Sequence, residues 1–369
     1  MARPSEKKES RQVFLDVLRV AATMAVVMMH VISGVLNGGY DFTGYERRVR
    51  AFRALVDATS WSVPLFLMIS GYLFLNPKKE ITWKDAICKY CRRILLALLL
   101  FGVPFAFLES FLGTGHFEFW MIPQAFWNTA IGQSWAHLWY LYLILILYAV
   151  TPALKAVLEL IPAKLTYLIL LVLLVGTSVL PFLQALSGKA QIVALPSQGI
   201  YLFYYLCGYV YAIRRRRPDV GEASICLIGL VAVIGLGIML RFEPGYNVDM
   251  AYGYPLTFAA TLMLFDLGWA LEHGKRERGK SGRKKTKKDS EAKKEGWIIR
   301  AALWLSPLCF GIYLIHPVFL NFFYKYKNLS IMNFRFFIGV PLFFLIAFVG
   351  SIIGSYVMRL IPPLRKYVL

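Results

Sequence analysis

Apolar segments separated by short polar stretches run along the whole chain, and most have the length of a membrane-crossing helix. Such a helix needs about 20 predominantly apolar residues. The pattern predicts spans at residues 13–36, 55–75, 94–112, 136–154, 164–184, 199–213, 222–241, 251–271, 297–320 and 334–357. We therefore expect an all-α, polytopic membrane protein of about ten transmembrane helices. Residues 1–369 are predicted to form a single membrane-embedded domain.

The composition agrees with this class, because 58% of the residues are hydrophobic and only 17% are charged. Soluble domains are about one quarter charged. The net charge is +20, and the basic residues gather at alternate ends of the apolar segments, as in cytoplasmic loops. An even number of spans then places both termini in the cytoplasm. No aromatic platform or nucleic-acid-binding fold accompanies the charge, so we expect no nucleic-acid partner.

The most basic stretch covers residues 272–296, which contain several Gly and Ser but no Phe, Trp or Tyr. Such a composition cannot bury enough apolar surface to fold. A cluster of Lys and Arg beside a membrane span is also attracted to anionic lipids. We therefore predict a disordered cytoplasmic loop within the domain, with anionic lipids as partners.

One predicted loop contradicts the general charge pattern. Residues 37–54 should face outward, yet they contain Arg47, Arg48, Arg50 and Arg53. Either these arginines bind an anionic partner on the outer side, or the stretch is a basic amphipathic helix that lies on lipid headgroups. Both interpretations stay open at the level of the sequence.

The first span carries three polar side chains that membrane helices rarely contain, Asp16, Arg19 and His30. A charged residue at the bilayer centre costs roughly 2.5–3.5 kcal/mol, which favours a functional role. Arg19 and His30 lie on one helix face, about 16 Å apart along the axis, and Asp16 can pair with Arg19. We hypothesise that Arg19 holds an anionic donor and that His30 is a general base. The alternative for Asp16 and Arg19 is an anchor at the membrane interface.

Other polar and aromatic side chains in the spans are candidates for contacts with a substrate. The candidates are Ser70, Tyr72, His137, Trp139, Tyr140 and His316. Each also has a simpler interpretation, since Ser70 suits close helix packing and aromatic residues form belts at membrane interfaces. His316 can line a polar chamber or merely bond a neighbouring carbonyl. No Cys, His or acidic spacing matches a metal site, so no bound metal is expected.

Arg19 and His30, with ten residues between them, are followed by the motifs SVPLFLMISGYLF, KYCRRI, HLWYLYLILILYAVTPAL and YLIHP. Together these features resemble the acyltransferase-3 family of integral membrane O- and N-acyltransferases. The resemblance covers nearly the whole chain, and the branch that modifies surface polysaccharides is the most similar.

The resemblance implies an enzyme of the bacterial inner membrane that takes an acyl group, usually acetyl, from cytoplasmic acyl-CoA. The acceptor would be a hydroxyl or amine of a cell-surface or lipid-linked carbohydrate on the outer side. Arg19 and His30 match the essential Arg and His of the family. No permanently bound cofactor is implied, because acyl-CoA is a donor substrate.

Basic residues on the cytoplasmic side complete the set that the resemblance implies. Arg92 and Arg93 match the basic motif of the family, which can pair with the phosphates of CoA. Arg214 and Arg215 are further candidates for the same contact. Some relatives carry an additional extracytoplasmic domain, and we expect this chain to complete the transfer alone or with a separate partner.

The main alternative is a transporter or flippase for a polysaccharide unit. It would also need polar residues within the membrane and aromatic residues facing outward. It would not need a cytoplasmic site for CoA, and the sequence shows no internal repeat of the kind that marks many transporters. The enzyme is therefore the favoured hypothesis.

Overall fold

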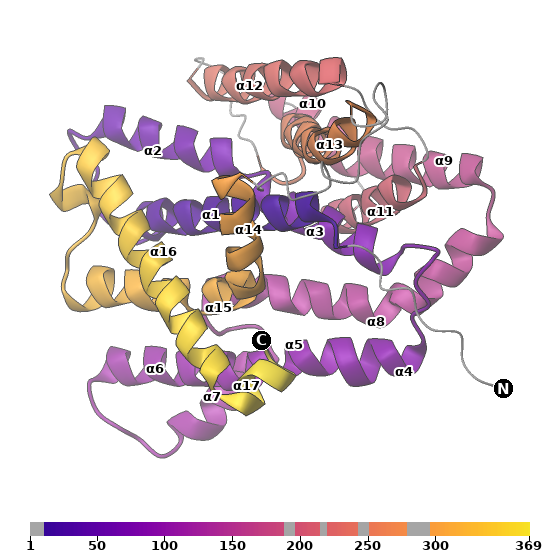
Figure 1. The fold of residues 1–369 in the computed structure, drawn as a ribbon. Helices are drawn as coiled ribbons and strands as arrows, with labels where there is room; N and C mark the ends of the chain where they lie inside the picture. The colour runs from indigo at the N-terminus through magenta and orange to yellow at the C-terminus, as the bar shows by residue number, and fades with distance from the viewer. Residues whose placement is uncertain (1–10, 188–195, 215–219, 243–250, 279–295) are drawn as a thin grey trace, which may run out of the picture.

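The computed structural model describes residues 11–187, 196–214, 220–242, 251–278 and 296–369 (Figure 1). Every regular element in these ranges is helical, and they contain no strand. The α-helices are α1 Val13–Leu36, α2 Glu46–Thr59, α3 Ser62–Phe74, α4 Trp83–Asp85, α5 Arg92–Ala97, α6 Val103–Thr114, α7 Met121–Ala130, α8 Trp139–Leu160, α9 Ala163–Leu174, α10 Leu180–Ser187, α11 Gly199–Ile213, α12 Val220–Phe242, α13 Pro255–Arg278, α14 Trp297–Leu305, α15 Cys309–Asn321, α16 Phe336–Leu360 and α17 Pro362–Tyr367.

Eight helical runs in the described ranges are long and apolar enough to cross a membrane, and two shorter apolar helices accompany them. Some runs join several elements. One example is Trp83–Thr114, in which π-helical turns connect α4, α5 and α6. Each segment that the sequence predicts to span falls on one of these helices. The class of all-α, polytopic membrane protein is therefore confirmed, while the side that each end faces stays a prediction.

Two stretches that the sequence places between the predicted spans are helical. Residues 46–54 form the first turns of α2, because Val49 and Phe52 give this stretch a buried apolar face. This agrees with the amphipathic helix that the sequence left open, while its position on lipid headgroups stays a prediction. Residues 272–278 continue α13 to Arg278. A helix that has started in an apolar segment extends readily into Glu, Lys and Arg, which are good helix formers. The rest of the predicted disordered loop, residues 279–295, lies outside the described ranges.

Helix α1 is central in the bundle, where it contacts α2, α3, α13, α14, α15 and α16. Figure 1 shows α1 and α3 in the middle, with α12 and α13 above them and α5 and α8 below. Leu18, Ala22 and Val26 of α1 belong to the main core, and Val31 and Val35 pack in a second core with residues of α15 and α16. Because other helices surround α1, its polar side chains lie inside the protein.

Two glycines allow α3 and α11 to touch through their backbones. A Cβ atom at Gly71 would lie 1.8 Å from the carbonyl oxygen of Tyr205, and one at Gly208 would lie 2.2 Å from that of Met68. Only glycine fits at such distances, as in other close helix pairs of membrane proteins. The contact fixes α3, and with it Ser70, next to the core of the protein.

Candidate active site

A cavity of about 480 Å³ lies between α1, α3, α5, α8, α15 and α16. Arg19, Arg93 and Arg359 line it in one region, and His30 and His137 line it in another. Arg19 and His30 are about 16 Å apart along α1, because an α-helix rises about 1.5 Å per residue. The cavity therefore connects an arginine end with a histidine end inside the membrane domain.

Asp16 organises the arginine end. Asp16 is only 5% exposed. Its carboxylate accepts hydrogen bonds from Arg11 Nε at 2.6 Å and from Arg19 Nη1 at 3.2 Å. Ser306 Oγ donates to the same carboxylate at 2.5 Å and accepts from Arg19 Nη1 at 2.8 Å. A buried carboxylate needs such partners. The predicted Asp16–Arg19 pair is thus present, and it fixes Arg19 at the cavity wall.

Backbone oxygens position the other two guanidinium groups of the arginine end. Arg93 donates from Nε to the carbonyl of Val368 at 2.7 Å and from Nη2 to a terminal carboxylate oxygen of Leu369 at 2.6 Å. Arg359 Nη1 donates to the carbonyl of Pro307 at 2.7 Å. Asp16 is the one carboxylate side chain among the described partners of these three arginines. This end is suited to bind an anion such as a phosphate.

Three histidines from three separate parts of the chain meet near the other end, where His30 and His137 line the cavity and His316 lies behind them in contact with both rings. The ring centroids of His30 and His316 are 4.9 Å apart, those of His137 and His316 are 5.5 Å apart, and those of His30 and His137 are 6.3 Å apart. His137 is 4% exposed and His316 is fully buried. The structure therefore brings together three candidates that are distant in the sequence.

Hydrogen bonds to backbone carbonyls define which nitrogen of each ring carries the proton. His30 Nδ1 is 2.8 Å from the carbonyl of Val26, and His316 Nδ1 is 3.1 Å from that of Ile312. His137 Nε2 is 3.2 Å from the carbonyl of Leu314. A carbonyl only accepts, so each of these nitrogens is the N–H donor. Each neutral imidazole then keeps its second nitrogen as a base.

Hydroxyl and aromatic groups line the cavity between and around its two ends. Ser70, Tyr140 and Tyr148 are among the lining residues, and Trp139 stacks on Tyr252 with 6.0 Å between the ring centroids. Hydroxyl groups at these places can donate to a carbonyl oxygen of a bound molecule. The stacked pair offers a flat apolar face beside the histidines.

Several residues predicted to bind a substrate or CoA lie away from this cavity. Tyr72 packs against Phe14 and Trp269 in the core. Arg92 lies over the ring of Tyr367 at 5.6 Å, and Arg214 forms an ion pair with Asp266 at 2.6 Å. A helix turns by about 100° per residue, so neighbouring positions such as Arg92 and Arg93 face different surroundings. Arg215 lies outside the described ranges.

The structure adds residues that sequence reasoning missed. Arg359 and Ser306 belong to the arginine end, and Tyr252 and Tyr313 belong to the histidine end, where the Tyr313 hydroxyl donates to the carbonyl of His137 at 2.5 Å. Arg359 was detectable as a basic residue in the last turn of the final span. Ser306, Tyr252 and Tyr313 are ordinary residues for a membrane helix, and their sequence positions carry no signal. No group of His, Cys, Asp or Glu in the described ranges is arranged to hold a metal ion.

The fold and the site define a polytopic helical membrane protein with a polar chamber enclosed in its bundle. A family model described as an acyltransferase domain matches residues 12–360. The chain therefore belongs to the acyltransferase-3 family and is a membrane acyltransferase. No curated protein and no solved structure matches the chain.

Proposed function

We propose that the protein transfers an acyl group, acetyl in the simplest case, from cytoplasmic acyl-CoA to a carbohydrate at the outer side of the bacterial plasma membrane. The acceptor group is a hydroxyl or an amine of a cell-surface or lipid-linked glycan. One observation carries the proposal: a single cavity joins a group of fixed guanidinium side chains to a group of basic imidazole nitrogens. The first suits an anionic donor, and the second suits a proton transfer.

The arginine end would hold the donor. Phosphate groups of CoA are strong hydrogen-bond acceptors, and guanidinium groups bind them with charge-assisted hydrogen bonds. Arg93 and Arg359 are already oriented by backbone oxygens, so little side-chain entropy is lost when they bind an anion. The thioester arm of CoA would then extend past Arg19 along the cavity, toward His30.

The histidine end would perform the transfer. His30 Nε2 accepts the proton of the acceptor hydroxyl, and the hydroxyl oxygen forms a bond to the thioester carbonyl carbon. The carbon–sulfur bond breaks, and the proton passes from His30 to the leaving sulfur, so that free CoA and an acyl ester result. A relay in which His30 Nε2 first carries the acyl group would use the same arrangement. Trp139 and Tyr252 would support the sugar ring.

The test uses the purified protein in proteoliposomes with acetyl-CoA labelled in the acetyl group, and it follows release of CoA. We compare the parent protein with His30→Ala. His116→Ala is the matched control, because His116 is exposed in the loop before α7 and lies outside the cavity. We expect CoA release by the parent and by the control, and at least a hundredfold slower release by His30→Ala.

Each result has a clear meaning for the proposal. Release that His30→Ala retains in full would remove His30 from the reaction. If acetyl-CoA is not consumed, a series of longer acyl-CoA donors in the same assay identifies the acyl group. If no acyl-CoA binds or reacts in the presence of surface glycans, the proposal is wrong. The family assignment favours the enzyme over a polysaccharide transporter or flippase, which would release no CoA.

A further inference from the structure

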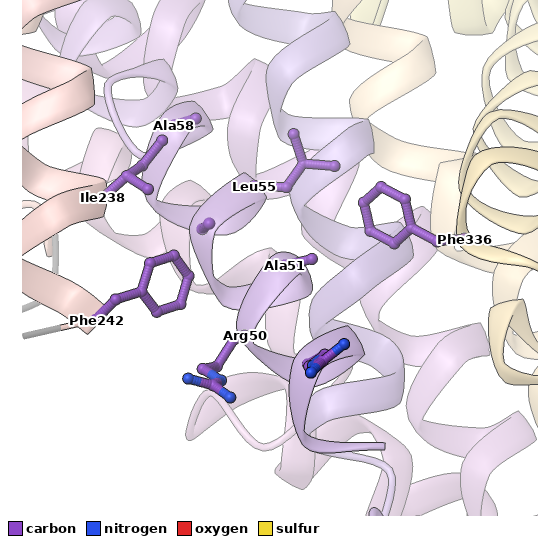
Figure 2. Close-up of a pocket in the computed structure, with 9 residues that line it drawn as sticks. Arg50, Ala51, Leu55, Ala58, Ile238, Phe242 and Phe336 are labelled. Atoms are coloured by element: carbon purple, nitrogen blue, oxygen red, sulfur yellow. The ribbon is translucent and has the colours of Figure 1, made fainter. Parts of the chain in front are cut away.

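A second hollow lies outside the cavity of the candidate active site, on the surface of the bundle. It has a volume of about 670 Å³ and lies between α2, α12 and α16. Figure 2 shows α2 in its centre, with Ile238 and Phe242 of α12 on one side and Phe336 of α16 on the other. We call this hollow the α2 groove. It shares no lining residue with the cavity that Arg19 and His30 line.

The α2 groove uses one face of α2. Its lining residues on this helix are Arg47, Arg50, Ala51, Ala54, Leu55 and Ala58. Residues spaced three and four apart lie on the same side of a helix, so these six form a continuous strip. The strip begins with two guanidinium groups and continues with small apolar side chains. A charged end followed by an apolar path is the pattern of a lipid with an anionic headgroup.

Other arginines fix the walls of the groove. Arg241 of α12 forms two hydrogen bonds of 2.8 Å with the carboxylate of Asp57, which ties α12 to α2. Arg48 donates to the carbonyl of Met332 at 3.1 Å and also to those of Ile331 and Phe334, just before α16 begins. These bonds hold both neighbours of α2 in place. The groove is therefore fixed by the protein itself.

Arg47 and Arg50 differ from these two arginines. Both are exposed, and neither makes an ion pair or hydrogen bond among the residues that the structure describes. Glu46 precedes them; its carboxylate accepts the N–H of Gly44 at 3.0 Å and attracts Arg50 electrostatically across the exposed helix surface. Two exposed cations that make no direct ion pair among the described residues, beside an apolar strip in a membrane protein, favour binding of an anionic partner.

We propose that the α2 groove binds a membrane lipid with an anionic phosphate headgroup. The phosphate lies at Arg47 and Arg50, and one acyl chain lies along Ala51, Ala54 and Ala58 against Ile238 and Phe242. The predicted topology places this headgroup at the outer side of the membrane. The binding is independent of acyl transfer and can be measured without it.

The test measures lipid retention by native mass spectrometry on the full chain in mild detergent. Dioleoylphosphatidylglycerol is the anionic probe, and dioleoylphosphatidylcholine is the neutral one. We expect the parent protein to prefer the anionic lipid, and the double variant Arg47→Gln, Arg50→Gln to bind it roughly 30-fold more weakly. Arg53→Gln is the matched control, because Arg53 is exposed on the same helix but outside the groove. It should bind as the parent does.

A second variant tests the apolar part of the groove. Ala54→Phe fills the strip while it leaves both arginines in place, so it should also lose the anionic lipid. Ala58→Leu serves the same purpose if Ala54→Phe does not fold. Equal retention of both lipids by the parent protein, or equal losses in Arg53→Gln and the double variant, would overturn the proposal. If a folded variant with a filled strip binds the anionic lipid as the parent does, the lipid is attracted by the arginines alone and no acyl chain lies in the groove. This result would also overturn the proposal.

Discussion

The two ends of the cavity that Arg19 and His30 line hold their polar side chains in different ways. At the arginine end, part of the hydrogen-bonding capacity of each guanidinium is directed to fixed oxygens, as in the contacts of Arg19 with Asp16 and Ser306, and the remaining N–H groups can bind a ligand. At the histidine end, each ring donates one N–H to a backbone carbonyl and keeps one basic nitrogen. A held cation is suited to binding, and a held base is suited to proton transfer. The difference supports our proposal that one end binds the donor and the other end performs the chemistry.

The largest expected effect lies at the histidine end. His30→Gln keeps a polar side chain of similar length but removes the basic nitrogen, so kcat should fall by roughly 10²- to 10⁴-fold. KM for acyl-CoA should change little, because His30 does not belong to the arginine end. Steady-state measurement of CoA release gives both constants. A large rise in KM for acyl-CoA with an unchanged kcat would mean that His30 binds the donor, and it would contradict the proposed separation of binding and proton transfer between the two ends.

The next largest effect lies at the arginine end. A hydrogen bond to a charged group contributes roughly 1.5–3 kcal/mol, so Arg93→Gln should raise KM for acyl-CoA by roughly 10- to 100-fold. The rate at saturating donor should be nearly unchanged, since this interaction is made equally in the ground state and the transition state. The measurement is a titration of acyl-CoA against initial rate.

Arg92→Gln is the control for this variant. Arg92 is adjacent in the sequence, but it lies over Tyr367 rather than in the cavity, and its substitution should leave KM within about twofold of the parent value. Equal effects of both substitutions would mean that CoA binds to the basic surface of the protein and not in the cavity.

Much of the fold could be predicted from the sequence, because a helix in a membrane must satisfy its backbone internally and be apolar over its whole length. This constraint identifies each span by composition alone. It also made Asp16, Arg19 and His30 visible as exceptions.

The partners of these exceptions could not be predicted. The contact between His30 and His316 joins residues nearly 300 positions apart, and helical periodicity carries no information about which helices are neighbours. Tyr72 illustrates the same limit, because its helix was predicted correctly while its side chain faces the core. Arg92 and Arg93 show that a basic motif identifies a region, whereas the three-dimensional structure selects the residue.

A smaller effect should distinguish the acceptor from the donor. Trp139→Leu removes the ring that stacks on Tyr252 while it keeps an apolar side chain of moderate size. If a sugar packs on this pair, KM for the carbohydrate acceptor should rise several-fold, by analogy with aromatic contacts of about 0.5–1.5 kcal/mol. KM for acyl-CoA should stay the same. Identical acceptor constants for the variant and the parent would place the acceptor elsewhere.

The smallest expected effect concerns the support of Arg19. Ser306→Ala removes the hydroxyl that donates to Asp16 and accepts from Arg19, while the direct ion pair between these two at 3.2 Å is kept. We expect a loss of stability of about 1 kcal/mol and a rise of about two- to threefold in KM for acyl-CoA. Ser351→Ala is the matched control, because Ser351 is also buried but bonds only the carbonyl of Ala347 in its own helix. It should lower the thermal midpoint to a similar degree and leave KM unchanged. If both variants raise KM equally, the effect comes from general loosening of the bundle, and the position of Arg19 does not determine how the donor binds.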